Sequence, residues 1–236
     1  MDYRKPAVFG ENWSTSRYDV LPYFAVERAV LARPDIHRIL EVGCGNGWNM
    51  SRFAQHGRVA FGLDYEPERV SLALAHGPAL LADGLRLPFA DGSFDMIYIQ
   101  HVLHHIGNVE RALQEVRRCL RPNGILFLIE TVEDNPVIRW GRRLYPSWLG
   151  DEVNASFTVA ELATQLSDGG FRVRRAGQYS VMFWLWEILP DQVPALETLT
   201  PYVVPLERAL QRIARRFSAH CFFVADKASF GETFGK

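Results

Sequence analysis

The sequence has few cysteines and no excess of charge of either sign. Its three cysteines, Cys44, Cys119 and Cys221, lie far apart and form no CxxC pair. This pattern argues against a disulfide framework and against a zinc site, and it suits a reducing, cytoplasmic location. The formal net charge is -1, so the chain lacks the positive excess with which proteins bind a phosphate backbone. We therefore expect no nucleic-acid partner.

Long hydrophobic runs are also missing. A membrane-spanning helix needs roughly 18 or more apolar residues, and the longest candidate, residues 181–189, is shorter. The N-terminal residues contain no apolar segment of signal-peptide length. The sequence thus predicts neither a membrane span nor a secretion signal.

The remaining composition, with 48% hydrophobic and 22% charged residues, is that of a globular protein. Short aliphatic runs alternate with helical patterns, which is typical of βαβ units and a parallel sheet. Two late strands suit an antiparallel edge hairpin. The sequence predicts an open α/β fold with a mostly parallel seven-stranded sheet, helices on both faces and an antiparallel last strand. The expected strands are residues 38–42, 59–63, 79–82, 96–100, 125–129, 171–176 and 220–225.

Helices are expected between these strands and around them. Thr158 and Glu161 have the spacing of a capping box, which predicts a helix start at that point. An amphipathic pattern ahead of the first strand predicts a leading helix. The expected helices are residues 18–32, 48–55, 67–75, 109–120, 158–167 and 206–217.

A glycine-rich turn follows the first predicted strand. Glu41 lies near the strand end, and Gly43, Cys44, Gly45 and Gly47 form a turn that opens a helix. Glycines allow positive φ and let a ligand approach the backbone, while the helix N-terminus offers free N–H groups. Tight turns also need glycine, so the turn alone is weak evidence. Its position between strand and helix, with an acidic residue two positions ahead, favours a ligand site.

Two acidic residues follow the next two strands. Asp64, ahead of Tyr65, ends the second strand, where a carboxylate can accept hydrogen bonds from both hydroxyls of a ribose. A cap for the following helix is the alternative role for Asp64. Asp83 begins a loop with Gly84 and Leu85, and an ordinary polar turn is the alternative there.

These motifs, in this order, resemble class I S-adenosylmethionine-dependent methyltransferases of the Rossmann-like fold over about residues 38–130. The resemblance implies S-adenosylmethionine as cofactor, S-adenosylhomocysteine as product, and no metal. It implies one methyltransferase domain over residues 1–236, in which residues 1–35 form an N-terminal cap and residues 36–130 the cofactor-binding core. Residues 131–157 and 179–217 would be insertions that form a lid and shape the acceptor pocket.

The resemblance also assigns roles within the motifs. Glu41 would lie near the sulfonium and amino group, which a negative charge favours. Asp64 would bind the ribose, and Asp83 the adenine amine. The implied cofactor-binding residues are Glu41, Gly43, Cys44, Gly45, Gly47, Asp64, Tyr65, Asp83, Gly84, Leu85 and Gln100.

The fourth predicted strand ends in Gln100-His-Val-Leu-His-His105-Ile, which resembles methyltransferases of quinone biosynthesis. Ligands of open α/β sheets bind at the carboxyl ends of the strands, so Gln100 and His101 are expected beside the transferred methyl group. A neutral imidazole there can take the proton of a hydroxyl acceptor, which makes His101 and His105 the candidate catalytic residues. For His104 and His105 a hydrogen bond to loop backbone is the favoured alternative. Positioning alone can also drive methyl transfer.

The expected acceptor is a small organic molecule, methylated on oxygen or carbon, such as a quinone, phenol or sugar. Aromatic pockets favour flat or apolar ligands, although each such ring can equally pack within its own insertion. Phe183, Trp184 and Trp186 would alternatively touch a membrane surface or a second subunit, and the oligomeric state stays open. The candidate lining residues are Tyr18, Trp140, Arg142, Arg143, Tyr145, Trp148, Phe183, Trp184 and Trp186.

Other functions fit these motifs less well. Methyltransferases of nucleic-acid amino groups carry an [Asn/Asp]-Pro-Pro-aromatic motif after strand four, where this chain has Gln100-His-Val-Leu. A nicotinamide oxidoreductase would carry GxGxxG, and the glycine spacing here differs. A subunit that binds S-adenosylmethionine without catalysis and activates a partner stays open.

Overall fold

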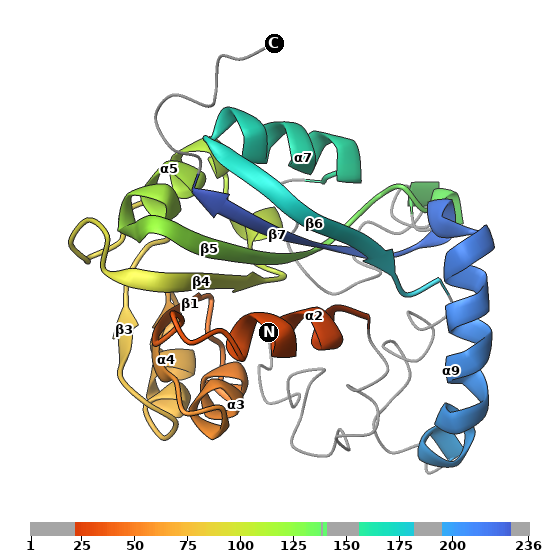
Figure 1. Ribbon diagram of the computed structural model, residues 1–236, viewed down its shortest axis with the longest axis horizontal. Helices are drawn as coiled ribbons and strands as arrows, with labels where there is room; N and C mark the ends of the chain where they lie inside the picture. The colour runs from red at the N-terminus through yellow and green to blue at the C-terminus, as the bar shows by residue number, and fades with distance from the viewer. Residues whose placement is uncertain (1–21, 138, 141–155, 182–194, 228–236) are drawn as a thin grey trace.

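The computed structural model describes residues 22–137, 139–140, 156–181 and 195–227 (Figure 1). The predicted fold is confirmed: a seven-stranded sheet in the order β3-β2-β1-β4-β5-β7-β6. β7 runs antiparallel to both of its neighbours, and the other pairs are parallel. The strands are β1 (Arg38–Val42), β2 (Val59–Asp64), β3 (Ala79–Leu81), β4 (Phe94–Gln100), β5 (Leu120–Thr131), β6 (Phe171–Tyr179) and β7 (His220–Lys227).

Helices cover both faces of the sheet (Figure 1). One apolar cluster joins α2, α3 and α4 to the sheet, and a second joins α5 and α7 to the opposite face. Neighbouring strand residues belong to opposite clusters, as with Ile39 and Leu40, because side chains alternate across a strand. The described helices are α2 (Pro22–Leu31), α3 (Trp48–Gln55), α4 (Pro67–Ala73), η1 (Leu103–His105), α5 (Val109–Cys119), α7 (Val159–Asp168), α9 (Ala195–Ile213) and η2 (Arg215–Phe217).

Local signals placed several boundaries correctly. The predicted capping box is present, with the Thr158 side chain accepting from the N–H of Glu161 and the Glu161 side chain accepting from the N–H of Thr158. β5 differs from its prediction because it begins at Leu120 rather than at residue 125. The ladder with β4 shifts register between the pairs Phe94↔Leu120 and Met96↔Ile125. Residues 121–124 therefore lie within β5, at an irregularity of the ladder, rather than ahead of the strand.

The predicted start of the last helix, at residue 206, is wrong. α9 begins at Ala195 and passes through Pro205. Proline lacks an N–H donor and usually ends or kinks a helix, which is why the pattern placed the start after it.

Most of the predicted aromatic lining lies outside the described residues: Tyr18, Arg142, Arg143, Tyr145, Trp148, Phe183, Trp184 and Trp186. Trp140 is described, and its side chain is exposed. Within the described ranges no helix is long and apolar enough to cross a membrane.

Candidate active site

The glycine-rich turn has the geometry that its glycines predict. Gly43, Gly45 and Gly47 have φ of 72°, 53° and 83°, all in the left-handed region that side chains disfavour. A Cβ on Gly43 would also overlap the side chain of Val102. The N–H groups of Gly43 and Cys44 donate to the Leu63 carbonyl at 2.7 and 3.0 Å. The turn is thus fixed between β1 and β2, directly ahead of α3.

Asp64 lies beside this turn and is buried. Its Oδ2 accepts from the N–H of Gly45 at 2.9 Å, and its Oδ1 accepts from the N–H of Glu66 at 3.1 Å. Each carboxylate oxygen has a second lone pair, so both can still accept from ribose hydroxyls. Asp64 does not cap the following helix, because the N-cap of α4 is Glu66. Tyr65, next in the chain, is exposed.

Glu41 is buried at the end of β1, and only one of its oxygens has a hydrogen-bond donor. Oε1 accepts from Asn49 Nδ2 at 2.6 Å, whereas Oε2 is buried and has no hydrogen-bond partner among the described residues. Burial raises the pKa of Glu41 to about 8. A cationic group beside Oε2 would stabilise the charged carboxylate. The site therefore fits the positive end of S-adenosylmethionine.

Glu41 makes protein stability depend on pH. The folded-state pKa of about 8 exceeds the ordinary value of 4.5, so between these pH values the unfolded chain releases a proton that the folded chain keeps. Stability therefore falls as pH rises through this window. We expect Glu41→Gln to unfold at a higher temperature than the wild type at pH 8, with the difference shrinking towards pH 5. Thermal melts across this range check it, and equal pH profiles for both proteins would contradict it.

Asn49 joins Glu41 to the end of β4. Its Nδ2 also donates to Gln100 Oε1 at 3.0 Å, and its Oδ1 accepts from Arg52 at 2.9 Å. One amide therefore orients two of the predicted cofactor-binding side chains. Asn49 was absent from the predicted site because an isolated asparagine in a helix carries no motif.

A buried ion pair extends this network to the N-terminal helix. Arg52 pairs with Glu27 of α2, and its guanidinium lies 4.4 and 4.6 Å from the ring centroids of Phe24 and Trp48. The hydroxyl of Tyr98 on β4 donates to Glu27 at 2.8 Å. Burial raises the pKa of Glu27 against the lowering effect of Arg52. α2 is thereby connected through Arg52 to the residues around Glu41.

Asp83 begins the loop that the resemblance assigns to adenine. It is exposed, and its Oδ1 accepts from the N–H of Leu85 at 2.8 Å. The N–H of Leu85, one of the implied cofactor-binding residues, is thus used within the loop in this structure. The carboxylate keeps the capacity to accept from an exocyclic amine.

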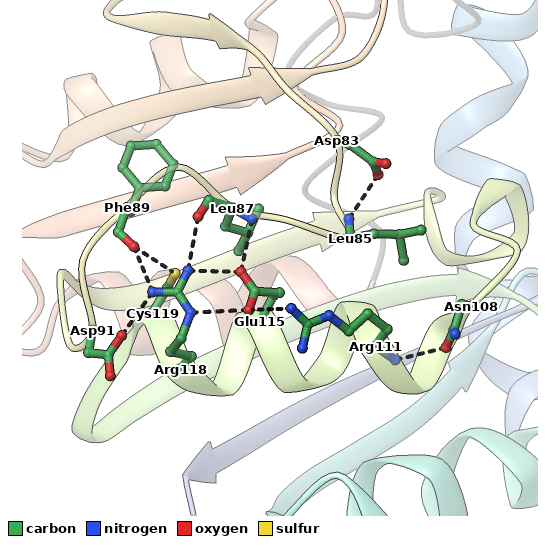
Figure 2. A network of polar contacts seen from close by, with 10 residues as sticks. All are labelled: Asp83, Leu85, Leu87, Phe89, Asp91, Asn108, Arg111, Glu115, Arg118 and Cys119. Carbon is green, nitrogen blue, oxygen red and sulfur yellow. Dashed lines mark hydrogen bonds and ion pairs between the residues drawn. The ribbon is translucent and has the colours of Figure 1, made fainter.

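Arg118 of α5 holds the rest of this loop in place. It donates to the carbonyls of Leu87 and Phe89 at 2.9 and 2.7 Å and pairs with Asp91 and Glu115. Figure 2 shows its guanidinium at the centre of these contacts, between the helix and the loop. The N–H of Leu87 donates to the same Glu115 carboxylate at 3.0 Å.

Loss of Arg118 should loosen this loop. We expect Arg118→Ala to lower the free energy of unfolding by about 2 kcal/mol, because two carbonyls and two carboxylates lose a charged donor. Arg111→Ala is the matched control: Arg111 pairs with Glu115 at 3.4 Å and not with the described residues of the loop, so its loss should cost less than about 0.5 kcal/mol. Urea denaturation measures both. Equal losses of unfolding free energy in the two variants would show that the contacts of Arg118 with the loop do not stabilise the protein.

His101 lies at the carboxyl end of β4 in an unusual backbone conformation, with φ of 54°. Its Nδ1 lies 3.2 Å from Thr131 Oγ1 and 3.9 Å from Glu130 Oε1. Its ring packs edge-on against His220, with centroids 5.0 Å apart. Non-glycine residues in this φ region cluster at functional sites. The structure thus places His101 and Gln100 at the same sheet edge as Glu41 and Asp64.

Glu130 is a buried carboxylate that the sequence analysis missed. It accepts from the N–H groups of Leu103 and Thr131 at 3.0 and 2.8 Å and contacts His104 Nδ1 at 2.5 Å. Burial raises the pKa of Glu130, but the hydrogen bond and charge of His104 and the charge of His101 bring it below its ordinary value. The partner of His104 is thus a carboxylate, rather than loop backbone as favoured above.

His105 belongs to η1, and its ring centroid lies 4.0 Å from that of His104. Among the described residues, no group of three or more His, Cys, Asp or Glu side chains is placed to hold a metal ion.

Comparison with known proteins identifies this arrangement. Residues 40–128 match the family model described as a methyltransferase domain. This part of the chain is therefore similar to a methyltransferase domain. The matched residues hold the glycine turn, Asp64, the Asp83 loop and the end of β4.

Known relatives support this identification. A demethylmenaquinone methyltransferase of Parafrankia sp. is 33% identical over 148 residues, 53% of this chain and 57% of the relative. A tRNA (carboxymethyluridine(34)-5-O)-methyltransferase of Schizosaccharomyces pombe is 27% identical over 144 residues, 61% of this chain and 55% of the relative. The chain spans about half the length of the curated relatives it matches.

The fold of the methyltransferase domain is likewise shared with solved structures. An S-adenosylmethionine-dependent methyltransferase of Mesorhizobium loti matches with a TM-score of 0.61 over 86% of this chain and 97% of that one, at 21% identity. The predicted resemblance to methyltransferases is confirmed by the family match, and the solved structure confirms the predicted fold.

Proposed function

We propose that this protein is an active enzyme that transfers the methyl group of S-adenosylmethionine to oxygen or carbon of a small organic acceptor. The observation that carries the proposal is the meeting of Glu41, Asp64 and His101 at one edge of the sheet. S-adenosylmethionine supplies a methyl group that is already activated. The protein then has to align the acceptor, exclude water and, for a hydroxyl, take up a proton.

Each residue at this edge has a task in the proposal. Asp64 accepts from the ribose hydroxyls, Asp83 accepts from the adenine amine, and Glu41 faces the positive end of the cofactor. His101 is the proposed proton acceptor. With Nδ1 held by Thr131, Nε2 is the nitrogen that we assign to the acceptor's proton. His105 is the second candidate for this role.

The proposed acceptor is a quinone-like or phenolic molecule. The support is the demethylmenaquinone methyltransferase among the relatives, together with the resemblance of the segment ending β4 to enzymes of quinone biosynthesis. RNA is the second candidate acceptor, since one relative is a tRNA methyltransferase. The net charge of -1 favours the small molecule, because RNA binding depends on neutralising phosphates.

Methyl-labelled S-adenosylmethionine tests the proposal. The purified protein is incubated with the label and, in separate reactions, with simple phenols, reduced naphthoquinones and bulk tRNA. We expect label in the organic extract of the phenol or quinol reactions. Label in tRNA or in protein alone would overturn the small-molecule proposal. Cofactor binding without transfer to any acceptor would instead identify a non-catalytic subunit.

A further inference from the structure

α9 presents an apolar stripe to solvent. Tyr202, Leu206 and Ile213 are 76%, 48% and 82% exposed, and Ala209 is exposed between them. At about 100° per residue, these four positions fall within about 60° of one another. They form one continuous face, which we call the apolar stripe. Contiguous apolar surface of this kind marks a contact with protein or membrane.

The opposite side of α9 is fixed to the body of the protein by a polar contact. Glu207 is buried, and its Oε1 accepts from the N–H of Val181, just after β6, at 2.7 Å and from Gln211 at 2.9 Å. A surface helix ordinarily turns its apolar face inward, and here the polar contact faces inward while the stripe faces outward. Figure 1 shows α9 at the rim of the molecule, beside the ends of β6 and β7.

The charges around the apolar stripe are positive. Arg208, Arg212, Arg215 and Arg216 are all exposed, and between residues 202 and 217 the one acidic residue is the buried Glu207. This local excess stands against a net charge of -1 for the whole chain. Arginine can keep its stem on apolar surface and its charge in water. An apolar stripe flanked by arginines is the pattern of helices that lie in the interface of anionic membranes.

We propose that α9 docks the protein on an anionic lipid surface, with the apolar stripe among the acyl chains and the arginines at the headgroups. Two-fold pairing of this face with a second copy would bring both arginine sets together without an exposed acid between them, which disfavours self-association. The inference does not depend on the proposed methyl transfer, because lipid binding is measured directly.

Vesicle flotation tests the proposal. The full chain is mixed with vesicles of phosphatidylcholine alone or of phosphatidylcholine with phosphatidylglycerol. We expect flotation with phosphatidylglycerol vesicles, weakened by raised salt because the attraction is screened. The double variant Leu206→Asp/Ile213→Asp should lose at least about tenfold in partition coefficient. Arg208→Gln/Arg212→Gln should lose on the order of 30-fold.

Leu72→Asp is the matched control, because Leu72 on α4 is 60% exposed and lies outside the stripe. It should float like the wild type, and all variants should keep the wild-type circular dichroism and the same affinity for S-adenosylmethionine. The proposal is overturned if the wild type does not float with phosphatidylglycerol vesicles, or if the stripe variants float equally well. A wild-type dimer that the stripe variants dissociate, without vesicle binding, would identify the stripe as a contact between copies.

Discussion

Replacing Asp64 by alanine is expected to weaken the binding of S-adenosylmethionine by at least about 100-fold. Two hydrogen bonds from ribose hydroxyls to a carboxylate would be lost, and each contributes roughly 1.5 kcal/mol or more. The same carboxylate accepts from the N–H of Gly45, so its removal also frees the glycine turn that the cofactor has to meet. Calorimetric titration with S-adenosylmethionine and S-adenosylhomocysteine measures the loss.

Two further variants separate binding from folding. Asp64→Asn keeps an oxygen that can accept from Gly45 but removes the charge, and we expect an intermediate affinity. Glu68→Ala removes an exposed acid in the first turn of α4 and should bind like the wild type. Thermal unfolding of each protein shows that it is folded. An Asp64→Ala protein that is folded and binds at wild-type affinity would refute the ribose assignment.

The parts of the site that could be predicted lie in short sequence motifs, each directly after a predicted strand. The glycine turn and Asp64 each follow a buried strand, and parallel strands bring their carboxyl ends to one edge. That rule alone placed Gln100 and His101 with the cofactor residues. The structure adds that Asp64 itself holds the turn, a contact that strand order does not specify.

The contacts that were missed join residues distant in sequence. Glu27 and Arg52 pair across 25 residues, and Tyr98 reaches Glu27 across 71. A buried glutamate in a helix and a tyrosine in an apolar strand carry no signal of this pairing. Glu130 directly follows the predicted strand 125–129 and belongs to no motif, and its role follows from where η1 places His104. Such partners depend on tertiary packing, which local patterns do not encode.

α9 shows the opposite limit, in which a local rule was trusted too far. Because proline usually ends or kinks a helix, the predicted helix began after Pro205, at residue 206. The helix in the structure begins eleven residues earlier, at Ala195. With the helix shortened, Tyr202 fell outside it and the stripe that runs from Tyr202 to Ile213 could not be recognised. The exposed face became visible only when the full helix and its burial were known.

Removal of the His101 imidazole is expected to lower kcat by about 100-fold, the lower end of the range for general acid–base catalysis. His101→Asn is the informative variant, because asparagine tolerates the positive φ of 54° found there. We expect a small loss of thermal stability, because the ring contacts with Thr131 and His220 are lost, and unchanged affinity for S-adenosylmethionine. Single-turnover transfer of labelled methyl to the acceptor that the labelling experiment identifies measures the loss. Wild-type kcat in a folded His101→Asn protein would show that positioning alone drives the transfer.

The comparison with His105→Asn decides between the two candidate histidines. The ring of His105 packs against His104, so its loss should disturb η1. We therefore expect His105→Asn to lower the thermal unfolding temperature and to change kcat little. Glu130→Gln provides a third measurement, since Glu130 touches His104 and lies 3.9 Å from His101 Nδ1. If Glu130 favours the protonated imidazole of His101, the amide should shift the pH profile of kcat to lower pH, because a neutral side chain stabilises the imidazolium less. A uniform drop in kcat without a shift would assign Glu130 a purely structural role.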